Sequence, residues 1–552
     1  MHTRGGSALV ARYAACVGLI LAASFLPVRA DIWQWSVPVA GGRNGAGPAV
    51  AYLWIPPSCS RIRGVVVAQN NLEEIQILEH PAFRKAMSDL NFAEVWVSPW
   101  FDLFFRFNEG AGDMFNSMMN DLASESGYSE LKDAPIVPIG HSAAASWPYY
   151  FAAWAPDRCL AALSVSGQWP YFRHPVFAPD IWGARNIDFI PSLETMGEYE
   201  SAENWANEGL LERKNHPLMP LSMFAGPAQG HFSATDKKID MLVLYIKKAV
   251  QYRMPAKLLA SGPVKLMPID PTKTGWLVER WHKDAPPAFA PAPVGQYKGD
   301  PSQAFWFFDE ETAKAVTAYQ ADYRGLKEQL CGYVQDGKTL PVTNTHFAVY
   351  VRFKPGSDGI TFHVSGTFLD ATPNDHGNMG LPANTPVGHA TGGGPVVVRK
   401  VMGPVERDGD DTFRLSLERG LGANQTKYGA TLEAVHPGDA EYKPACQQAD
   451  FSFPARNTQG GDQHITFPAI PNMKASAKPY TLDAVSDSGM PVSYYVESGP
   501  AVIDGNKLVL TAIPPRAKLP VKVTVVAWQY GRSIEPKVKS AAPVTQTFAV
   551  TR

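Results

Sequence analysis

The chain has 552 residues, which is too long for one ordinary hydrophobic core, so we expect two to four domains. Its formal net charge of −2 at pH 7 gives no electrostatic reason to expect nucleic acid or an anionic membrane surface as a partner. With 46 glycines, 47 prolines and 11% aromatic residues, the composition predicts a loop-rich protein that contains β-structure.

Residues 1–30 have the pattern of a secretory signal peptide. Arg4 and Arg12 supply positive charge, residues 14–26 form an apolar stretch, and residues 28–30 place small side chains where a signal peptidase cleaves. The stretch is short for a membrane span, and no later segment is long enough either. We therefore expect an exported protein without a membrane span, located in the periplasm or outside the cell.

Four cysteines remain once Cys16, in the apolar stretch, is removed: Cys59, Cys159, Cys331 and Cys446. An even number in an oxidising compartment favours two disulfides, and three pairings are possible. Cys59 and Cys159 both precede predicted strands at one edge of the same sheet, so we predict that they pair and that Cys331 pairs with Cys446. The absence of a Cys-x-x-Cys motif argues against a zinc site, and we predict no metal and no cofactor.

Between residues 31 and 262 predicted strands and helices alternate, which is typical of a mostly parallel sheet covered on both faces. In such sheets the reactive groups lie at the carboxyl ends of the strands. The predicted strands are residues 49–55, 64–68, 92–97, 134–139, 160–164, 191–196 and 218–224, and the predicted helices are 81–90, 114–124, 146–155 and 237–252.

The rest of the chain predicts β-structure. A proline-rich linker (284–294) and a helix (310–329) open a second domain, residues 263–460, in which alternating strands predict a β-sandwich. These strands are residues 347–353, 360–369, 396–401, 412–417 and 430–435. Residues 461–552 contain short, regularly spaced strands, which predict a small immunoglobulin-like sandwich. We interpret the acidic run at 408–411 as a charged hairpin turn rather than a calcium site.

The most informative motif is Gly140-His141-Ser142-Ala143-Ala144, which directly follows the predicted strand 134–139. It differs from Gly-x-Ser-x-Gly only at its last position. Small side chains fit a sharp strand-to-helix turn with a serine at its apex. We therefore predict Ser142 as a nucleophile and the amide of Ala143 as an oxyanion donor.

A serine nucleophile needs a base that is oriented by an acid, in the chain order Ser, acid, His. His231 follows the last predicted strand in a glycine-containing loop, where we predict it to be the base. Glu200 follows the preceding strand in Gly197-Glu198-Tyr199-Glu200 and is the favoured acid, with Glu198 as the alternative. Asp180 and Asp188 are further possibilities.

Other residues are candidates for contact with the substrate. Asn70 and Asn71, which follow the predicted strand 64–68, are expected to contribute to an oxyanion hole, although an ordinary Asn turn fits equally well. The neighbouring Glu73 and Glu74 fit helix capping better than a metal site. His141 beside the nucleophile and Trp169, in an aromatic-rich segment between two strands, are expected to bind substrate; packing against the sheet edge is the alternative for Trp169.

These motifs resemble the α/β-hydrolase superfamily, and more narrowly secreted bacterial esterase-like hydrolases with accessory β-domains. The resemblance lies in Gly-His-Ser-Ala-Ala, Gly-Glu-Tyr-Glu and Gly-His-Phe, in the order of the family, and covers residues 31–262. It implies an α/β fold with a mostly parallel eight-stranded sheet, followed here by two β-sandwich-type domains, and a Ser-His-acid triad that forms an acyl-enzyme. The acid, a Glu rather than an Asp, and the loop after residues 64–68 depart from the commonest family pattern.

We therefore expect an exported serine hydrolase that cleaves carboxylic esters, with polymer- or polysaccharide-linked esters as one kind of substrate. The alternatives are a serine peptidase or amidase, because the same triad cleaves amides, and a non-catalytic surface-binding protein on a hydrolase scaffold. The expected partner is an ester substrate. The sequence does not determine the oligomeric state.

Overall fold

The computed structural model describes residues 32–257, 262–343, 348–373 and 381–552. The predicted signal peptide lies outside these residues. Within them, no helix combines the length and apolar character that a membrane crossing requires.

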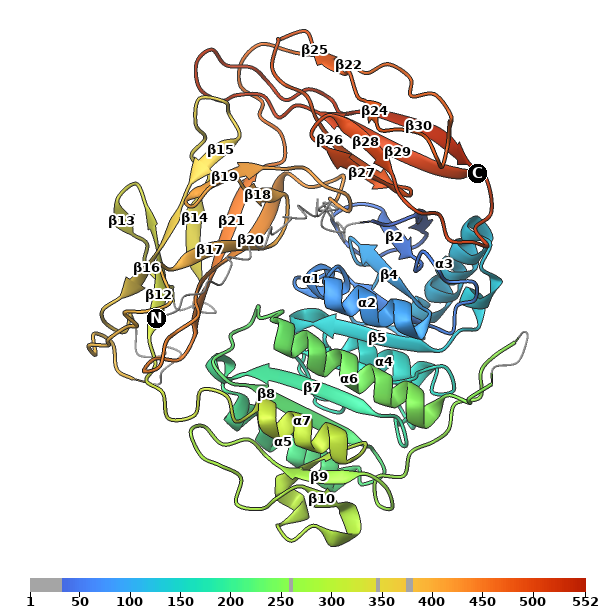
Figure 1. The fold of residues 1–552 in the computed structure, drawn as a ribbon, viewed down its shortest axis with the longest axis vertical. Coiled ribbons are helices and arrows are strands. Elements are labelled where there is room, and N and C mark those ends of the chain that lie inside the picture. Colours follow the sequence, from blue (N-terminus) through green and yellow to red (C-terminus); the bar gives the residue numbers. More distant parts are fainter. Residues whose placement is uncertain (1–31, 258–261, 344–347, 374–380) are drawn as a thin grey trace, which may run out of the picture.

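An eight-stranded sheet forms the centre of the first unit, with the order β1-β2-β4-β3-β5-β6-β7-β8 (Figure 1). β1 and β2 are antiparallel to their neighbours, and all other pairs are parallel. Strands such as β3 are buried along their whole length, because helices cover both faces of the sheet. The strands are β1 Trp35–Val39, β2 Ala49–Trp54, β3 Gly64–Gln69, β4 Phe92–Ser98, β5 Ile136–His141, β6 Ala162–Val165, β7 Ser192–Gly197 and β8 Leu221–Gly226.

The helices of this unit are α1 Glu74–Leu78, α2 Pro81–Leu90, α3 Ala111–Ser126, α4 Trp147–Trp154, α5 Ala202–Asn215 and α6 Asp236–Arg253. Four of them, α2, α3, α4 and α6, match predicted ones, whereas α1 and α5 were not predicted. α2 begins at Pro81, whose missing N–H costs nothing in the first turn, and ends before Asn91 in a left-handed conformation with φ +55°. The sheet order and the helices on both faces define an α/β-hydrolase fold, as predicted.

The hydrophobic core of the first unit continues past the expected boundary at residue 262. It includes residues of β9 (Trp276–Glu279), β11 (Ala304–Phe307) and α7 (Glu310–Tyr319), and β10 (Ala292–Pro293) pairs with β9. The helix predicted over 310–329 ends early, at Tyr319. Tyr323 and Gly325 adopt left-handed conformations, with φ +57° and +75°, which a continuing helix does not allow.

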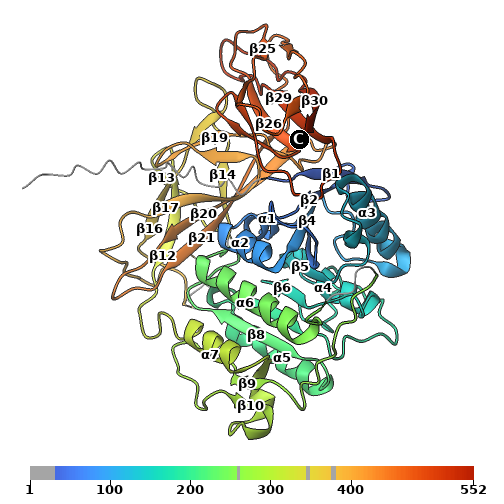
Figure 2. The same cartoon turned by 45° about the vertical axis from the view of Figure 1, so that its right-hand side comes forward.

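The second unit, a β-sandwich-type domain, lies beside the sheet of the first (Figures 1 and 2). Its sheets have the orders β14-β21-β20-β17, β13-β12-β16 and β15-β19-β18. Phe362 and Phe451 stack in its core with ring centroids 4.3 Å apart. The run 408–411 joins the antiparallel strands β18 and β19, as the hairpin interpretation predicts. The strands are β12 Leu330–Gln335, β13 Lys338–Thr339, β14 Val349–Arg352, β15 Thr361–His363, β16 Ser365–Leu369, β17 Val397–Met402, β18 Val405–Arg407, β19 Thr412–Leu415, β20 Lys427–His436 and β21 Ala445–Pro454.

The third unit is a smaller sandwich that packs over β1 and β2 (Figure 2). The amide of Gly499 donates to the carbonyl of Trp33 at 2.9 Å, and Arg516 pairs with Glu130 at 2.5 Å. Its main sheets have the orders β23-β30-β29-β26 and β24-β28-β27, and β22 pairs with β25. The strands are β22 Ile465–Thr466, β23 Met473–Lys474, β24 Tyr480–Thr481, β25 Val485–Ser486, β26 Ser493–Ser498, β27 Ala501–Asp504, β28 Lys507–Leu510, β29 Val521–Trp528 and β30 Val544–Thr551.

The two predicted disulfides are not formed in the structure, where Cys59, Cys159, Cys331 and Cys446 are free thiols. The carbonyl of Cys59 accepts a hydrogen bond from the Tyr128 hydroxyl, whereas the carbonyl of Cys159 accepts one from Arg253. Cys331 and Cys446 lie on β12 and β21, and the Cys331 thiol is directed at the carbonyl of Ala445. Burial raises the pKa of Cys59 to about 11 and that of Cys331 to about 12.

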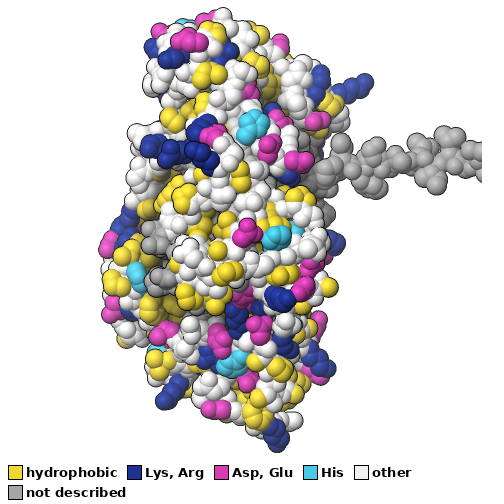
Figure 3. Space-filling view, turned by 90° about the vertical axis from the view of Figure 1, so that its left-hand side faces the viewer, with side chains coloured by type: hydrophobic (Ala, Val, Ile, Leu, Met, Phe, Trp, Pro, Cys, Tyr) yellow, Lys and Arg dark blue, Asp and Glu magenta, His cyan; other side chains and the backbone are white. Residues whose placement is uncertain are grey.

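On the face shown in Figure 3, acidic and basic side chains are interspersed, without a large area of one sign. This distribution agrees with the small net charge of −2.

Candidate active site

Ser142 lies at the apex of the turn between β5 and the following 3-10 turn, Ser142–Ala144. Its φ of +56° is a left-handed conformation that a non-glycine residue adopts at some cost, and such strain is concentrated at functional sites. The turn requires small neighbours. A Cβ on Gly140 would lie 2.1 Å from the carbonyl oxygen of Ala144, and a Cβ on Gly167 would lie 1.9 Å from the Cβ of Ala145. The motif therefore folds as predicted, with the hydroxyl presented at the carboxyl edge of the sheet.

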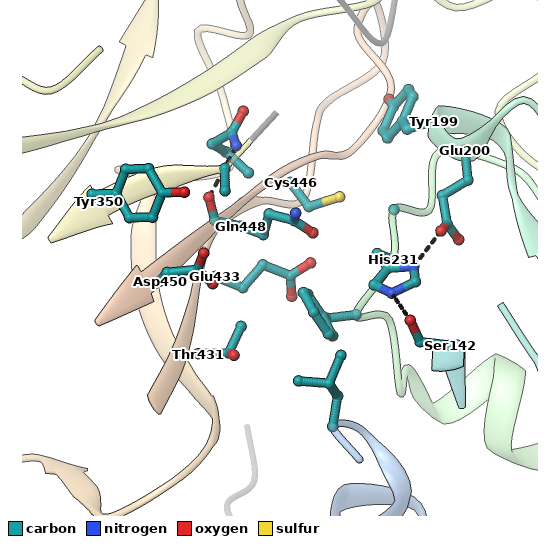
Figure 4. A pocket seen from close by; sticks show the side chains of 15 residues that line it. Ser142, Tyr199, Glu200, His231, Tyr350, Thr431, Glu433, Cys446, Gln448 and Asp450 are labelled. Atoms are coloured by element: carbon teal, nitrogen blue, oxygen red, sulfur yellow. Dashed lines mark hydrogen bonds and ion pairs between the residues drawn. The ribbon is translucent and has the colours of Figure 1, made fainter. Parts of the chain in front are cut away.

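The structure brings Ser142, His231 and Glu200 together (Figure 4). Ser142 Oγ lies 2.9 Å from His231 Nε2, and His231 Nδ1 binds Glu200 Oε1. The three residues follow β5, β8 and β7, whose carboxyl ends meet at one edge of the parallel sheet. This arrangement fits a hydroxyl that donates to a histidine whose other nitrogen donates to a carboxylate.

The contact between His231 and Glu200 favours the protonated imidazolium and the ionised carboxylate. Burial alone lowers the pKa of His231, but the Glu200 carboxylate outweighs this effect and raises the pKa above its ordinary value. Burial alone raises the pKa of Glu200, and His231 outweighs it and lowers the pKa. Glu200 therefore stabilises the imidazolium that forms when His231 accepts a proton.

The alternative acids have other surroundings. Glu198 accepts from the amide of Ala228 at 2.8 Å and pairs with Lys443 of the second unit at 2.9 Å. Asp180 is exposed and pairs with Arg173 at 3.7 Å. Of the acidic residues considered, Glu200 is the one that binds His231.

His141 is fully buried and does not line the cavity beside Ser142, so the expectation that it binds substrate is wrong. Its Nε2 lies 2.8 Å from the carbonyl oxygen of His231, which accepts the hydrogen bond. Glu73 Oε2 lies 3.6 Å from the same nitrogen and 3.4 Å from Lys238 Nζ. Burial lowers the pKa of His141 well below its ordinary value, so the ring is neutral at pH 7. His141 therefore anchors the loop that carries His231.

Trp169 is also remote from the cavity, and the packing alternative describes it correctly. Its side chain is 1% exposed, its indole N–H donates to the carbonyl of Trp205 at 3.0 Å, and its ring stacks on Phe305. A buried tryptophan between α5 and β11 stabilises the first unit and does not reach Ser142.

The loop after β3 does not supply the expected amide donors. The amide of Asn70 donates to the carbonyl of Val97 at 2.8 Å, and the amide of Asn71 donates to Glu74 at 3.0 Å. The Asn71 side chain donates to the carbonyl of His141 at 3.0 Å. Both main-chain amides and the Asn71 side chain therefore already donate hydrogen bonds within the protein, so the expectation that these groups bind an oxyanion is wrong. The amide of Ala143, next to the nucleophile, remains the candidate oxyanion donor.

Glu74 connects this loop to the nucleophile strand. Its carboxylate accepts from the amides of Asn71, of Leu72 at 2.7 Å and of His141 at 2.8 Å. Burial raises the pKa of Glu74 to about 7, although these hydrogen bonds oppose the rise. The capping interpretation is wrong, because Glu73 at the N-cap of α1 makes no side-chain cap hydrogen bond and the amides that Glu74 binds lie before α1 or at the end of β5. Among the residues described, no group of three or more His, Cys, Asp or Glu is arranged to hold a metal ion.

A cavity of about 410 Å³ opens beside the triad, and the second unit forms its opposite wall (Figure 4). From the first unit it is lined by Leu72, Ser142, Tyr199, Glu200, Gly230, His231 and Phe232. From the second unit it is lined by Ala348, Tyr350, Thr431, Glu433, Cys446, Gln447, Gln448 and Asp450. The two walls are close, since a Cβ on Gly230 would lie 2.8 Å from Cys446 Sγ. Sequence reasoning missed this second wall, because no local motif marks it.

No family model and no curated protein matches this sequence. Among solved structures, the chain is similar to esterase PE8, with 16% identity and a TM-score of 0.26 over 37% of this chain and 98% of that one. It is also similar to a dienelactone hydrolase from Anabaena variabilis, with 14% identity and a TM-score of 0.26 over 40% and 96%. A third is LpqC, a poly(3-hydroxybutyrate) depolymerase from Bordetella parapertussis, with 13% identity and a TM-score of 0.28 over 40% and 90%.

Proposed function

We propose that this protein is an exported serine hydrolase that cleaves carboxylic esters through an acyl-enzyme on Ser142. The observation that carries the proposal is the continuous chain of contacts from Ser142 Oγ to His231 Nε2, at 2.9 Å, and from His231 Nδ1 to Glu200. The strained φ of +56° at Ser142 supports it, because the strain presents the hydroxyl at a cavity large enough for a small ligand.

The reaction has two halves. Ser142 Oγ attacks the ester carbonyl while its proton passes to His231 Nε2, and Glu200 stabilises the resulting imidazolium. The amide of Ala143 donates to the oxyanion. His231 then returns the proton to the alcohol oxygen as the carbon–oxygen bond breaks, which leaves an acyl group on Ser142. Water attacks this acyl group in the second half, with His231 again taking and returning the proton.

Ser142→Ala tests the nucleophile. We expect it to abolish both labelling by a fluorophosphonate probe and turnover of 4-nitrophenyl acetate, with thermal unfolding nearly unchanged. Ser117→Ala is the matched control, because Ser117 is exposed on α3, and it should keep both activities. Full activity in Ser142→Ala would contradict the assignment, and absence of labelling and turnover in the wild type would favour a non-catalytic scaffold.

Export belongs to the same proposal and rests on the pattern of residues 1–30. Expression of the full chain in a bacterial host should yield a periplasmic or extracellular protein whose mass corresponds to a chain beginning at Asp31. An uncleaved chain that stays in the cytoplasm would contradict it.

A further inference from the structure

The wall opposite the triad is one face of the sheet β14-β21-β20-β17. Side chains alternate along its strands, so that Thr431 and Glu433 of β20 share a face with Gln448 and Asp450 of β21. Pairing places Thr431 opposite Asp450 and Glu433 opposite Gln448, while Tyr350 of β14 is also opposite Asp450. These five residues, named here the polar wall, form two adjacent cross-strand rows that line the cavity.

The alternate residues of the same strands, such as Leu432, Ala449 and Phe451, form the core of the second unit. A sheet face turned away from its core is normally polar because it meets water. Here it meets the catalytic triad instead. Figure 4 shows the side chains of Glu433 and Gln448 directed from the sheet towards the side on which His231 and Ser142 lie.

Glu433 is the most strongly held member of the wall. It is 1% exposed, and Arg399 binds its Oε2 through Nε at 3.0 Å and Nη2 at 2.6 Å. The guanidinium therefore neutralises the charge and fixes one carboxylate oxygen, and the Cys446 thiol also hydrogen-bonds this carboxylate. Because a carboxylate has about four acceptor sites, Glu433 still offers an oriented acceptor at the cavity. Thr431, at 5% exposure, is a second buried polar group on this face, whereas the Tyr350 ring is 55% exposed.

The chemistry of the wall selects among esters. Among the described residues that line the cavity none is Lys or Arg, whereas Glu200, Glu433 and Asp450 are acidic. A substrate with a phosphate or carboxylate near the ester would meet the exposed carboxylate of Asp450, and no Lys or Arg among these lining residues would attract it. Carboxylate, amide and hydroxyl groups bind neutral hydroxyls well, since each hydroxyl both donates and accepts. An exposed tyrosine ring adds an apolar face with a polar edge.

From this arrangement we propose that the polar wall recognises a neutral, hydroxyl-rich alcohol, so that the preferred substrates are acyl esters of sugars. The inference rests on the proposed esterase function and specifies its substrate class. The second unit is then the specificity domain of the enzyme: Ser142, His231 and Glu200 break the ester, and the polar wall holds the carbohydrate that leaves.

The test compares kcat/KM for two acetyl esters on the full-length protein. 4-Nitrophenyl acetate needs only the triad, because its leaving group carries no hydroxyls. Acetylated xylotriose, with free hydroxyls, needs the wall. We expect Asp450→Asn and Tyr350→Ala, both at exposed positions, each to lower kcat/KM for acetylated xylotriose about ten-fold or more and to change that for 4-nitrophenyl acetate less than about two-fold.

Asp410→Asn is the matched control, since Asp410 is exposed in the β18–β19 hairpin of the same unit, and it should leave both values unchanged. Glu433→Gln should reproduce the selective loss, and its thermal unfolding is recorded because the residue is buried. A loss equal for both esters, or no loss for either, would overturn the inference.

Two further outcomes separate the inference from the proposed function. Wild-type protein that cleaves 4-nitrophenyl acetate but not acetylated xylotriose would overturn the inference alone. A preference for acetylcholine over acetylated xylotriose would also overturn it, because the acidic residues would then serve a cationic alcohol. Wild-type protein that cleaves no ester and takes no fluorophosphonate label would overturn both.

Discussion

Lys443 of the second unit forms a buried ion pair with Glu198 of the first, at 2.9 Å, two residues before the Glu200 that binds His231. The lysine also lies 2.9 Å from Asp284, and the neighbouring Pro444 carbonyl accepts from the Tyr199 hydroxyl at 2.6 Å. Two residues of the second unit thus hold the segment that carries Glu200.

The first prediction concerns this ion pair. Lys443→Met should lower the free energy of unfolding by about 3 kcal/mol, because the buried Glu198 would lose its nearer cation and keep only Lys283, at 3.9 Å. Urea unfolding followed by tryptophan fluorescence measures the change. Lys327→Met is the control, since Lys327 forms an exposed pair with Glu441, and its unfolding midpoint should stay unchanged. Equal midpoints for the two variants would show that the buried pair contributes nothing.

The second prediction separates the two glutamates. Glu200→Gln should reduce kcat for 4-nitrophenyl acetate on the order of 10³-fold, because it removes the charge that stabilises protonated His231. Glu198→Gln should retain most of the activity and lose stability, since it disrupts the pair with Lys443. The opposite pattern would exchange their roles.

The third prediction is the pH dependence of the reaction. His231 acts as a base only when neutral, and Glu200 raises its pKa above the ordinary 6.5, so kcat/KM should fall as the pH drops through a value above 6.5. Glu200→Gln should move this acid limb to lower pH, because burial then lowers the pKa without opposition from the carboxylate. A limb that does not move would argue against their coupling.

The raised pKa of His231 also makes the free energy of unfolding depend on pH. Activity should fall as the pH drops, whereas this contribution to stability is lost as the pH rises. A histidine whose pKa is higher in the folded state stabilises the fold fully below its unfolded value, and this contribution is lost as the pH rises through the folded value. The difference in unfolding free energy between wild type and Glu200→Gln should therefore be larger at pH 6 than at pH 9.

The fourth prediction concerns His141 as a positioning residue. His141→Phe keeps a ring in the buried site but removes the donor to the His231 carbonyl. We expect kcat for 4-nitrophenyl acetate to fall roughly 10- to 100-fold with KM nearly constant, since misplacement of the base affects the chemical step. His141→Gln, which keeps a donor, should recover part of the rate. A change in KM with kcat unchanged would contradict this role.

The triad could be predicted because each member has a local signal. Ser142 lies in a motif of small residues after a strand, and His231 and Glu200 each follow a strand of a parallel sheet, whose carboxyl ends converge. The failures share another cause. His141 and Trp169 are polar or amphipathic residues near the motif, and sequence position does not reveal that both are buried and bound to main-chain carbonyls.

The polar wall had no comparable signal. Thr431, Glu433, Gln448 and Asp450 alternate with core residues as in any strand with one face in water. Only the docking of the second unit on the first turns that face into part of a cavity. The end of the helix predicted over 310–329 was also not visible in the sequence. The apolar pattern continues past Tyr319, but the helix ends there.

Because the cavity lies between two units, its two walls are synthesised at different times. Because Ser142, Glu200 and His231 precede residues 348–450 in the chain, synthesis produces the three residues of the proposed triad before the far wall of the cavity. On the proposed function, we expect the nascent chain to present Ser142 without the polar wall until β20 and β21 have been synthesised. We therefore expect selectivity among esters to arise later in the maturation of the protein than reactivity at Ser142.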